Sequence, residues 1–149
     1  DIIPGARCLE TYLNQCISKN AIIGGNGRYC FDNPLYNSRV MRDVGIRDSV
    51  EVDYVGHLWC FKKDWLYYMF GTKPFTYDTG EDMHLCFASK VFGNIKCYVA
   101  KQSAIDEDCD TTGNRLADDA VSSFKTSSHN VRKDIQNYFI KEHNLQFVI

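Results

Sequence analysis

Residues 77–99 constrain the fold of this chain most, because they combine a turn, a helix and a strand in direct succession. The turn ends at Gly80, and glycine is a strong punctuation signal between elements. Apolar spacing predicts an amphipathic helix over 81–93, followed by a short strand over 95–99. Two adjacent carboxylates therefore lie on the first turn of a helix, directly after a glycine.

These carboxylates are Glu81 and Asp82, and the simplest explanation for them is local. Thr79 and Asp82 have the spacing of a capping box with Asp in place of Glu. Acidic side chains in the first turn are also stabilised by the helix dipole, typically by about 0.3–1 kcal/mol each. A capping role explains one carboxylate and leaves the second without a local reason.

The composition indicates one ordinary globular domain. A length of 149 residues is enough for a single core, and an apolar fraction of 44% argues against disorder. The net charge of −2 argues against a broad nucleic-acid surface. No apolar run approaches the roughly 20 residues that cross a membrane. We therefore treat residues 1–149 as one domain and expect neither a nucleic-acid partner nor a membrane span.

The seven cysteines show no C-x-x-C pair and no regular spacing. An odd number without metal-ligand spacing favours free thiols and a reducing compartment such as the cytoplasm. Cys86 falls in the predicted helix and Cys97 in the predicted strand, where a free cysteine acts as a small apolar residue. A secretory-pathway location with some disulfides is the alternative that the sequence leaves open.

Apolar periodicity predicts further elements on both sides of this stretch. Helices are predicted over residues 7–18, 63–70, 115–124 and 131–143. Strands are predicted over residues 21–25, 49–55 and 145–149, the second of them ending at a glycine. Residues 33–47 are polar and rich in turn residues, which is typical of an irregular surface loop.

The motif G-E-D, followed by a helix, a glycine and a strand, resembles the ED motif of GT-A glycosyltransferases, especially inverting, family-2-like enzymes. Three earlier segments resemble the family in the same order: D-I-I-P at 1–4, I-I-G-G-x-G-R ending at Arg28, and the glycine and tryptophan segment at 56–65. The resemblance covers most of residues 1–100. It implies an α/β fold, namely the C-terminal portion of a GT-A mixed sheet flanked by helices.

The same resemblance implies a chemical role for the carboxylates. Asp82 would be the general base that takes the proton of an acceptor hydroxyl, with Glu81 beside it. The implied substrates are a nucleotide-sugar donor and a glycan or glycoconjugate acceptor, joined with inversion. A divalent cation, Mn²⁺ or Mg²⁺, would neutralise the leaving diphosphate. Asp1 matches the last carboxylate of the family's metal motif.

Six further residues are implied to border the substrates, and some of them have structural alternatives. For Trp59 the alternative is a place in the core, as for most aromatic side chains. For His57 it is a structural role, and for His84 it is a surface or capping role, because His84 faces away from Asp82 on the helix. The six candidates are Arg28, Gly56, His57, Trp59, Gly80 and His84.

Only one aspartate precedes the I-I-P segment, so we expect the chain to begin at the end of a D-x-D motif, without the nucleotide-binding half. Such a fragment would be inactive alone and would self-associate through the unpaired strand at 21–25. The alternative function is a non-catalytic carbohydrate-binding or protein-interaction domain on a GT-A-like scaffold.

Overall fold

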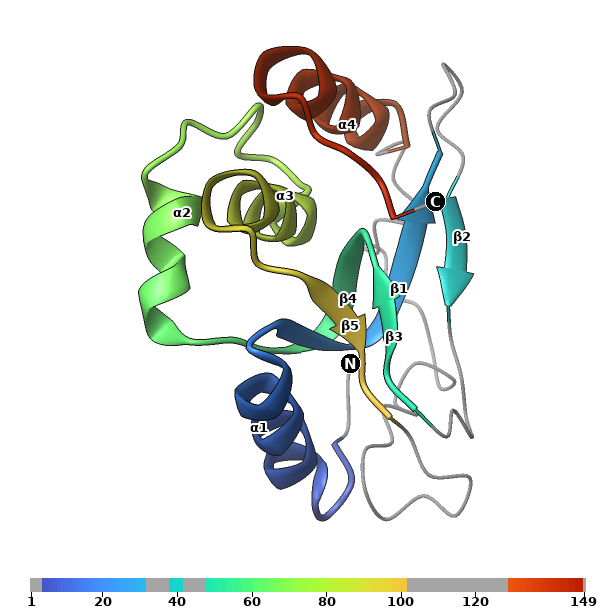
Figure 1. Cartoon of the computed structure of the whole chain (residues 1–149). Helices are drawn as coiled ribbons and strands as arrows, with labels where there is room; N and C mark the ends of the chain where they lie inside the picture. Colours follow the sequence, from blue (N-terminus) through green and yellow to red (C-terminus); the bar gives the residue numbers. More distant parts are fainter. Residues whose placement is uncertain (1–3, 32–37, 42–47, 102–128, 149) are drawn as a thin grey trace.

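The protein is described by a computed structural model that covers residues 4–31, 38–41, 48–101 and 129–148 (Figure 1). These residues form a mixed five-stranded sheet flanked by helices, as expected for an α/β protein. The strands are β1 (Ile22–Cys30), β2 (Ser38–Met41), β3 (Val50–Val52), β4 (Tyr54–Cys60) and β5 (Cys97–Val99). The helices are α1 (Cys8–Lys19), the short 3₁₀ turn η1 (Lys63–Trp65), α2 (Leu66–Phe70), α3 (Glu81–Gly93) and α4 (His129–His143).

Strand β1 is the centre of the sheet. It pairs antiparallel with β2 and β4 and parallel with β5, and β5 pairs antiparallel with β3. Close packing at Gly27 requires a glycine, because a Cβ there would lie 2.6 Å from Val52 Cγ2 and 2.7 Å from Val99 Cγ2. Residues 22–24 of the predicted strand 21–25 belong to the part of β1 that pairs with β4 on one side and with β5 on the other. Our expectation that this strand would be left unpaired was therefore wrong.

Helix α3 lies at the centre of the helical layer, between β4, α2 and α4 (Figure 1). Every residue from 82 to 89 is buried. The Phe87 ring packs edge-on against Tyr54 of β4 at 5.8 Å and against Phe139 of α4 at 5.5 Å. The helix has the predicted bounds, but it is not amphipathic, because neighbouring elements cover it on several sides.

The other described helices also confirm their predictions, with shifted ends or a different exposed face. Helix α1 buries Cys8, Tyr12 and Cys16 and leaves Leu9, Leu13 and Ile17 exposed. The predicted helix at 63–70 begins with a 3₁₀ turn, and the one at 131–143 begins at His129. None of the described helices is long and apolar enough to cross a membrane. The predicted helix at 115–124 lies outside the described residues.

The strand predicted over 49–55 is two strands, and the second continues through Gly56 to Cys60. Asp53 separates them, and its carboxylate is fully buried. That carboxylate accepts hydrogen bonds from the Cys30 and Val148 backbone N–H groups, both at 2.8 Å, and pairs with Lys90 Nζ at 3.2 Å. Asp53 thus ties the sheet to α3 and to the C-terminal segment.

Two predictions for irregular or terminal segments were wrong. Residues 38–41 of the polar segment 33–47 form β2, which pairs with β1 in the register Gly27↔Met41. Residues 144–148 have no regular secondary structure, although a closing strand was expected there. Both differences depend on contacts with distant parts of the chain, which local patterns do not encode.

Candidate functional site

Helix α3 begins at Gly80, which adopts a left-handed conformation with φ 84° and provides no side-chain cap. A Cβ at this position would lie 2.2 Å from Ile135 Cδ1, so only a glycine lets α4 pack against the start of α3. The predicted capping box of Thr79 and Asp82 is absent, because Gly80 occupies the N-cap position. Asp82 is therefore left for another role.

The Asp82 side chain turns toward α4 and is only 12% exposed. Arg132 Nη1 donates to Oδ1 at 3.2 Å and to Oδ2 at 3.0 Å. The Met83 backbone N–H donates to Oδ1 at 2.8 Å. Each carboxylate oxygen can accept about two hydrogen bonds, so Oδ2 retains accepting capacity among the described residues.

Gly56 of β4 faces both Asn26 and Asp82. A Cβ at Gly56 would lie 3.9 Å from Asp82 Oδ2 and 2.9 Å from Asn26 Oδ1. The lack of a side chain at this position therefore lets the Asn26 amide and the Asp82 carboxylate approach the same point of β4.

Strand register places Arg28 on the same side of the sheet as Gly56. Asn26 pairs with Gly56 and Arg28 pairs with Tyr54, whose ring contacts α3. Cross-strand partners share one face of a sheet, so Arg28 lies on the face that α3 covers. Arg28 is half-buried, and its predicted place at a substrate site stays a prediction.

Trp59 lies further along β4, beyond a register shift between β1 and β4. It pairs with Gly24, whereas Gly56 pairs with Asn26. Trp59 packs partly buried against the core, and its indole Nε1 has no hydrogen-bond partner among the described residues. Its predicted place beside a substrate stays a prediction. His57 follows Gly56 in β4, and its side chain lies outside the described part of the structure.

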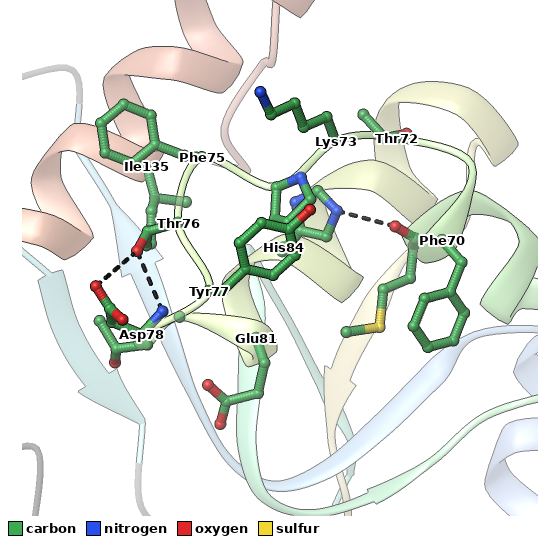
Figure 2. A pocket seen from close by; sticks show the side chains of 14 residues that line it. Phe70, Thr72, Lys73, Phe75, Thr76, Tyr77, Asp78, Glu81, His84 and Ile135 are labelled. Atoms are coloured by element: carbon green, nitrogen blue, oxygen red, sulfur yellow. Dashed lines mark hydrogen bonds between the residues drawn. The ribbon is translucent and has the colours of Figure 1, made fainter.

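Glu81 and His84 lie on the other flank of α3, where they line a cavity of about 600 Å³ (Figure 2). We call this cavity the loop pocket; its walls are residues 69–70, 72–81, His84 and Ile135. Glu81 is exposed and makes no hydrogen bond or ion pair within the described ranges. Asp82 is not part of the wall of the loop pocket, so the two adjacent carboxylates lie in different surroundings.

His84 is 5% exposed, so the expected surface position was wrong. Its Nε2 lies 3.0 Å from the Met69 carbonyl oxygen, which can only accept, so Nε2 carries a proton. The ring packs against Phe139 at 5.5 Å. The second ring nitrogen, Nδ1, is buried and has no partner among the residues that the structure describes.

The described residues do not fit a divalent-cation site. Asp1 lies outside them, and no group of three His, Cys, Asp or Glu side chains within 4–31, 38–41, 48–101 and 129–148 is placed to hold a metal. Asp82 is already paired with Arg132. We therefore derive no chemical step through a cation.

Thiol chemistry is disfavoured by burial. Burial, together with the neighbouring Cys60, raises the pKa of Cys16 to about 11, and burial also raises the pKa of Cys30 and Cys60. The pKa of Cys97 is raised by its hydrogen bond with Cys86 and by burial. The six cysteines in the described ranges are free thiols, and thiols with raised pKa values hold little of the reactive thiolate.

Three residues of this region were not foreseen from the sequence: Asn26, Arg132 and Ile135. Arg132 and Ile135 both fall in a helix that was predicted, but its partner element was unknown. They are three residues apart and so share one face of α4, which covers the start of α3. The only sequence signal for these two contacts was the three-residue spacing of an arginine and an isoleucine on a predicted helix. That spacing is common, so it is a weak signal.

No protein-family model, curated protein or solved structure matches the chain. The glycosyltransferase family remains a prediction from the motifs, and the function is argued from the site itself.

Proposed function

We propose that this chain is the acceptor-side part of a GT-A, family-2-like glycosyltransferase, which transfers a sugar from a nucleotide-sugar donor to an acceptor hydroxyl. The observation that carries the proposal is the placement of Asp82. Its carboxylate is buried at the start of α3, is held by Arg132 and the Met83 backbone N–H, and has Oδ2 on the side of Gly56. A positioned carboxylate whose Oδ2 retains accepting capacity is suited to general-base catalysis.

In this mechanism Asp82 Oδ2 accepts the proton of the acceptor hydroxyl. The acceptor oxygen forms a bond to the anomeric carbon while the bond from that carbon to the diphosphate oxygen breaks, and the diphosphate leaves with the electron pair. Arg132 orients the carboxylate by donating to both of its oxygens. Asn26, whose amide oxygen faces Gly56, can accept a hydrogen bond from a second hydroxyl of the acceptor.

The donor and its cation would be held mainly by residues outside the described part of the structure. Among the family-implied cation ligands only Asp1 belongs to this chain. A cation such as Mn²⁺ or Mg²⁺ would stabilise the charge of the leaving diphosphate. The residues of this site act on the acceptor instead: they bind it, orient it and remove its proton.

The second candidate is a non-catalytic carbohydrate-binding or protein-interaction domain. It is favoured by the ion pair itself, because Asp82 and Arg132 are 12% and 15% exposed and join α3 to α4. Removing one partner of a buried pair destabilises a protein by about 3–5 kcal/mol, and this pair, at the edge of the core, would cost less. A structural pair of this kind would explain the burial of Asp82 without any catalysis.

The replacement Asp82→Asn separates the two candidates. Asparagine keeps the shape and can still accept from Arg132, but it cannot take a proton. In the polypeptide that carries residues 1–149, assayed with a panel of nucleotide sugars and glycan acceptors, turnover should fall by about 10²–10⁴-fold while donor binding changes little. The matched control is Asp64→Asn, an exposed carboxylate in η1 outside the loop pocket, which should stay within about threefold of wild type.

Near-normal turnover per folded molecule in Asp82→Asn would contradict the catalytic role. Loss of stability alone, measured by urea denaturation, would then identify the Asp82–Arg132 pair as structural and support the non-catalytic candidate.

A further inference from the structure

The loop pocket is surrounded by aromatic side chains that nothing in the described chain covers. Tyr77 is 84% exposed, Phe70 is 76% exposed and Phe75 is 48% exposed. The Phe75 ring packs at 5.9 Å against Tyr138 of α4, which holds it at the pocket wall. Large exposed apolar side chains that cluster around one cavity more often belong to a binding site than to a surface without a binding function.

Polar groups lie between these rings (Figure 2). Asp78 is bonded locally to Thr76, whereas Lys73 and Glu81 make no hydrogen bond or ion pair among the described residues. The walls thus offer an ammonium donor and two carboxylate acceptors beside flat apolar faces. Two carboxylates against one cation disfavour a phosphate, so the nucleotide-sugar donor does not suit this pocket.

His84 lines the same pocket and is held in place by its own contacts. Its Nε2–H donates to the Met69 carbonyl oxygen at 3.0 Å, and its ring packs against Phe139. Nδ1 is buried without a partner among the described residues, so it does not face the open cavity.

A sugar ring matches this combination. One face of a pyranose is a surface of C–H groups that packs on an aromatic ring, and its edge is a ring of hydroxyls that donate and accept hydrogen bonds. The volume of about 600 Å³ lies within the range of small-molecule pockets. Neither an apolar chain nor an anion would use both the rings and the carboxylates.

The loop pocket is next to the Asp82 site without overlapping it. Glu81 and Asp82 are consecutive on α3, and Arg132 and Ile135 are one turn apart on α4, about 5 Å along its axis. A sugar whose hydroxyl meets Asp82 therefore cannot occupy the loop pocket with the same ring. A second ring of the same molecule can.

We infer that the loop pocket binds a non-reacting sugar unit of the acceptor, which makes the acceptor an oligosaccharide or glycoconjugate with at least two sugar units. The inference rests on the proposed function for its link to Asp82. Saccharide binding in the pocket is a separate property, which needs neither donor nor cation.

The test is methyl-detected NMR of the chain with ¹³C-labelled isoleucine methyl groups, titrated with unmodified mono-, di- and trisaccharides of glucose, galactose, mannose and N-acetylglucosamine. The Ile135 Cδ1 methyl lies in the pocket wall, and the buried Ile95 methyl serves as the internal reference. At least one di- or trisaccharide should shift the Ile135 signal, with higher affinity than its monosaccharide, while the Ile95 signal stays in place.

Variants then locate the ligand. Tyr77→Ala should weaken saccharide binding by roughly threefold to tenfold, because it removes one exposed ring face. Tyr67→Ala is the matched control, since Tyr67 is 78% exposed but lies outside the pocket wall, and it should bind as wild type. Glu81→Gln should weaken binding as well. All three side chains are exposed, so the variants should fold normally.

The inference is overturned if no saccharide shifts the Ile135 methyl at millimolar concentration, or if Tyr77→Ala and Tyr67→Ala bind alike. Its failure differs from failure of the proposed function. If Asp82→Asn abolishes transfer but Tyr77→Ala leaves the acceptor KM unchanged, the pocket is not an acceptor subsite. If Asp82→Asn keeps full turnover while Ile135 still responds to saccharides, the base is misassigned and the pocket stands.

Discussion

The two flanks of the α3 N-terminus differ in almost every physical respect, although adjacent carboxylates mark them. On one flank Asp82 is buried, paired with Arg132 and close to Gly56 of β4. On the other, Glu81 is exposed, has no partner in the described ranges and opens onto a cavity of about 600 Å³. The Asp82 flank has the features of a proton acceptor, and the Glu81 flank has the features of a ligand-binding surface.

Helix α4 is the cause of this difference. It places Arg132 on the first flank and Ile135 on the second, so an ion pair closes one side and an aliphatic side chain walls the other. Consecutive helical residues point about 100° apart, and that rotation is enough to separate the two environments. Two carboxylates that are adjacent in sequence thus lie in different environments because α4 packs against the start of α3.

The replacement Gly80→Ala should break both flanks at once and is expected to have the largest effect. A left-handed alanine costs about 1–2 kcal/mol, and the clash with Ile135 Cδ1 adds about 1–3 kcal/mol. Urea denaturation should therefore show a loss of about 2–5 kcal/mol, with saccharide binding and turnover both reduced.

A double variant separates the two causes of that loss. Ile135→Val removes the methyl group in the clash and leaves the backbone strain, so Gly80→Ala with Ile135→Val should recover part of the stability. If Gly80→Ala proves as stable as wild type, α4 does not pack on the start of α3 as described.

The elements of this region were predictable because their signals are local. Gly80 and Gly93 bracket the helical pattern, and the helix begins and ends where they predict. The same locality caused the errors. Gly56 was predicted to end a strand, whereas it lies inside β4, where the lack of a side chain makes room for the Asn26 amide near Asp82. A glycine in the sequence can mark the end of an element or a position where a side chain would clash, and the sequence alone does not distinguish the two.

The candidate site was predictable only in part. The motif singled out Asp82, but its partner Arg132 stands fifty residues later on a helix whose packing no local pattern reveals. Trp59 lies inside β4, beyond a register shift in the pairing of β4 with β1. A shift of this kind changes which residues of two strands lie opposite each other, and the sequence pattern of β4 alone does not reveal it.

Gly56→Ala should affect the Asp82 flank alone. The added Cβ would meet the end of the Asn26 side chain, which can rotate away, so the free energy of unfolding should change by less than about 1 kcal/mol. The added Cβ would lie 3.9 Å from Asp82 Oδ2 and would displace the Asn26 amide beside it. Misplacing the acceptor by about 1 Å can lower the rate by about 10²-fold.

Turnover and saccharide binding should therefore separate in Gly56→Ala. Steady-state kinetics should show a lower kcat, while the Ile135 methyl still responds to saccharides with wild-type affinity. Loss of saccharide binding in this variant would show that the two flanks form one site, and the comparison between them would no longer hold.

Raising the pH should change stability without distinguishing the flanks, which makes it the weakest perturbation of the comparison. The pKa of Cys16 is raised by burial from 9.0 to about 11, and the pKa values of Cys60 and Tyr98 are also raised by burial. Between pH 9 and 11 the unfolded chain loses these protons while the folded chain keeps them, so the free energy of unfolding falls as the pH rises.

Urea midpoints in the presence of a reductant should be unchanged below pH 8 and should decrease steadily from pH 9 to pH 10.5. In Cys16→Ala the decrease should be shallower, because one of the shifted groups is gone. The Ile135 and Ile95 methyl signals should lose their folded positions together, since Cys16 on α1 lies in the common core and favours neither flank. A midpoint that rises above pH 9 would mean that these thiols are already ionised in the folded protein, and loss of the Ile135 signal ahead of Ile95 would mean that α4 separates from α3 before the core unfolds.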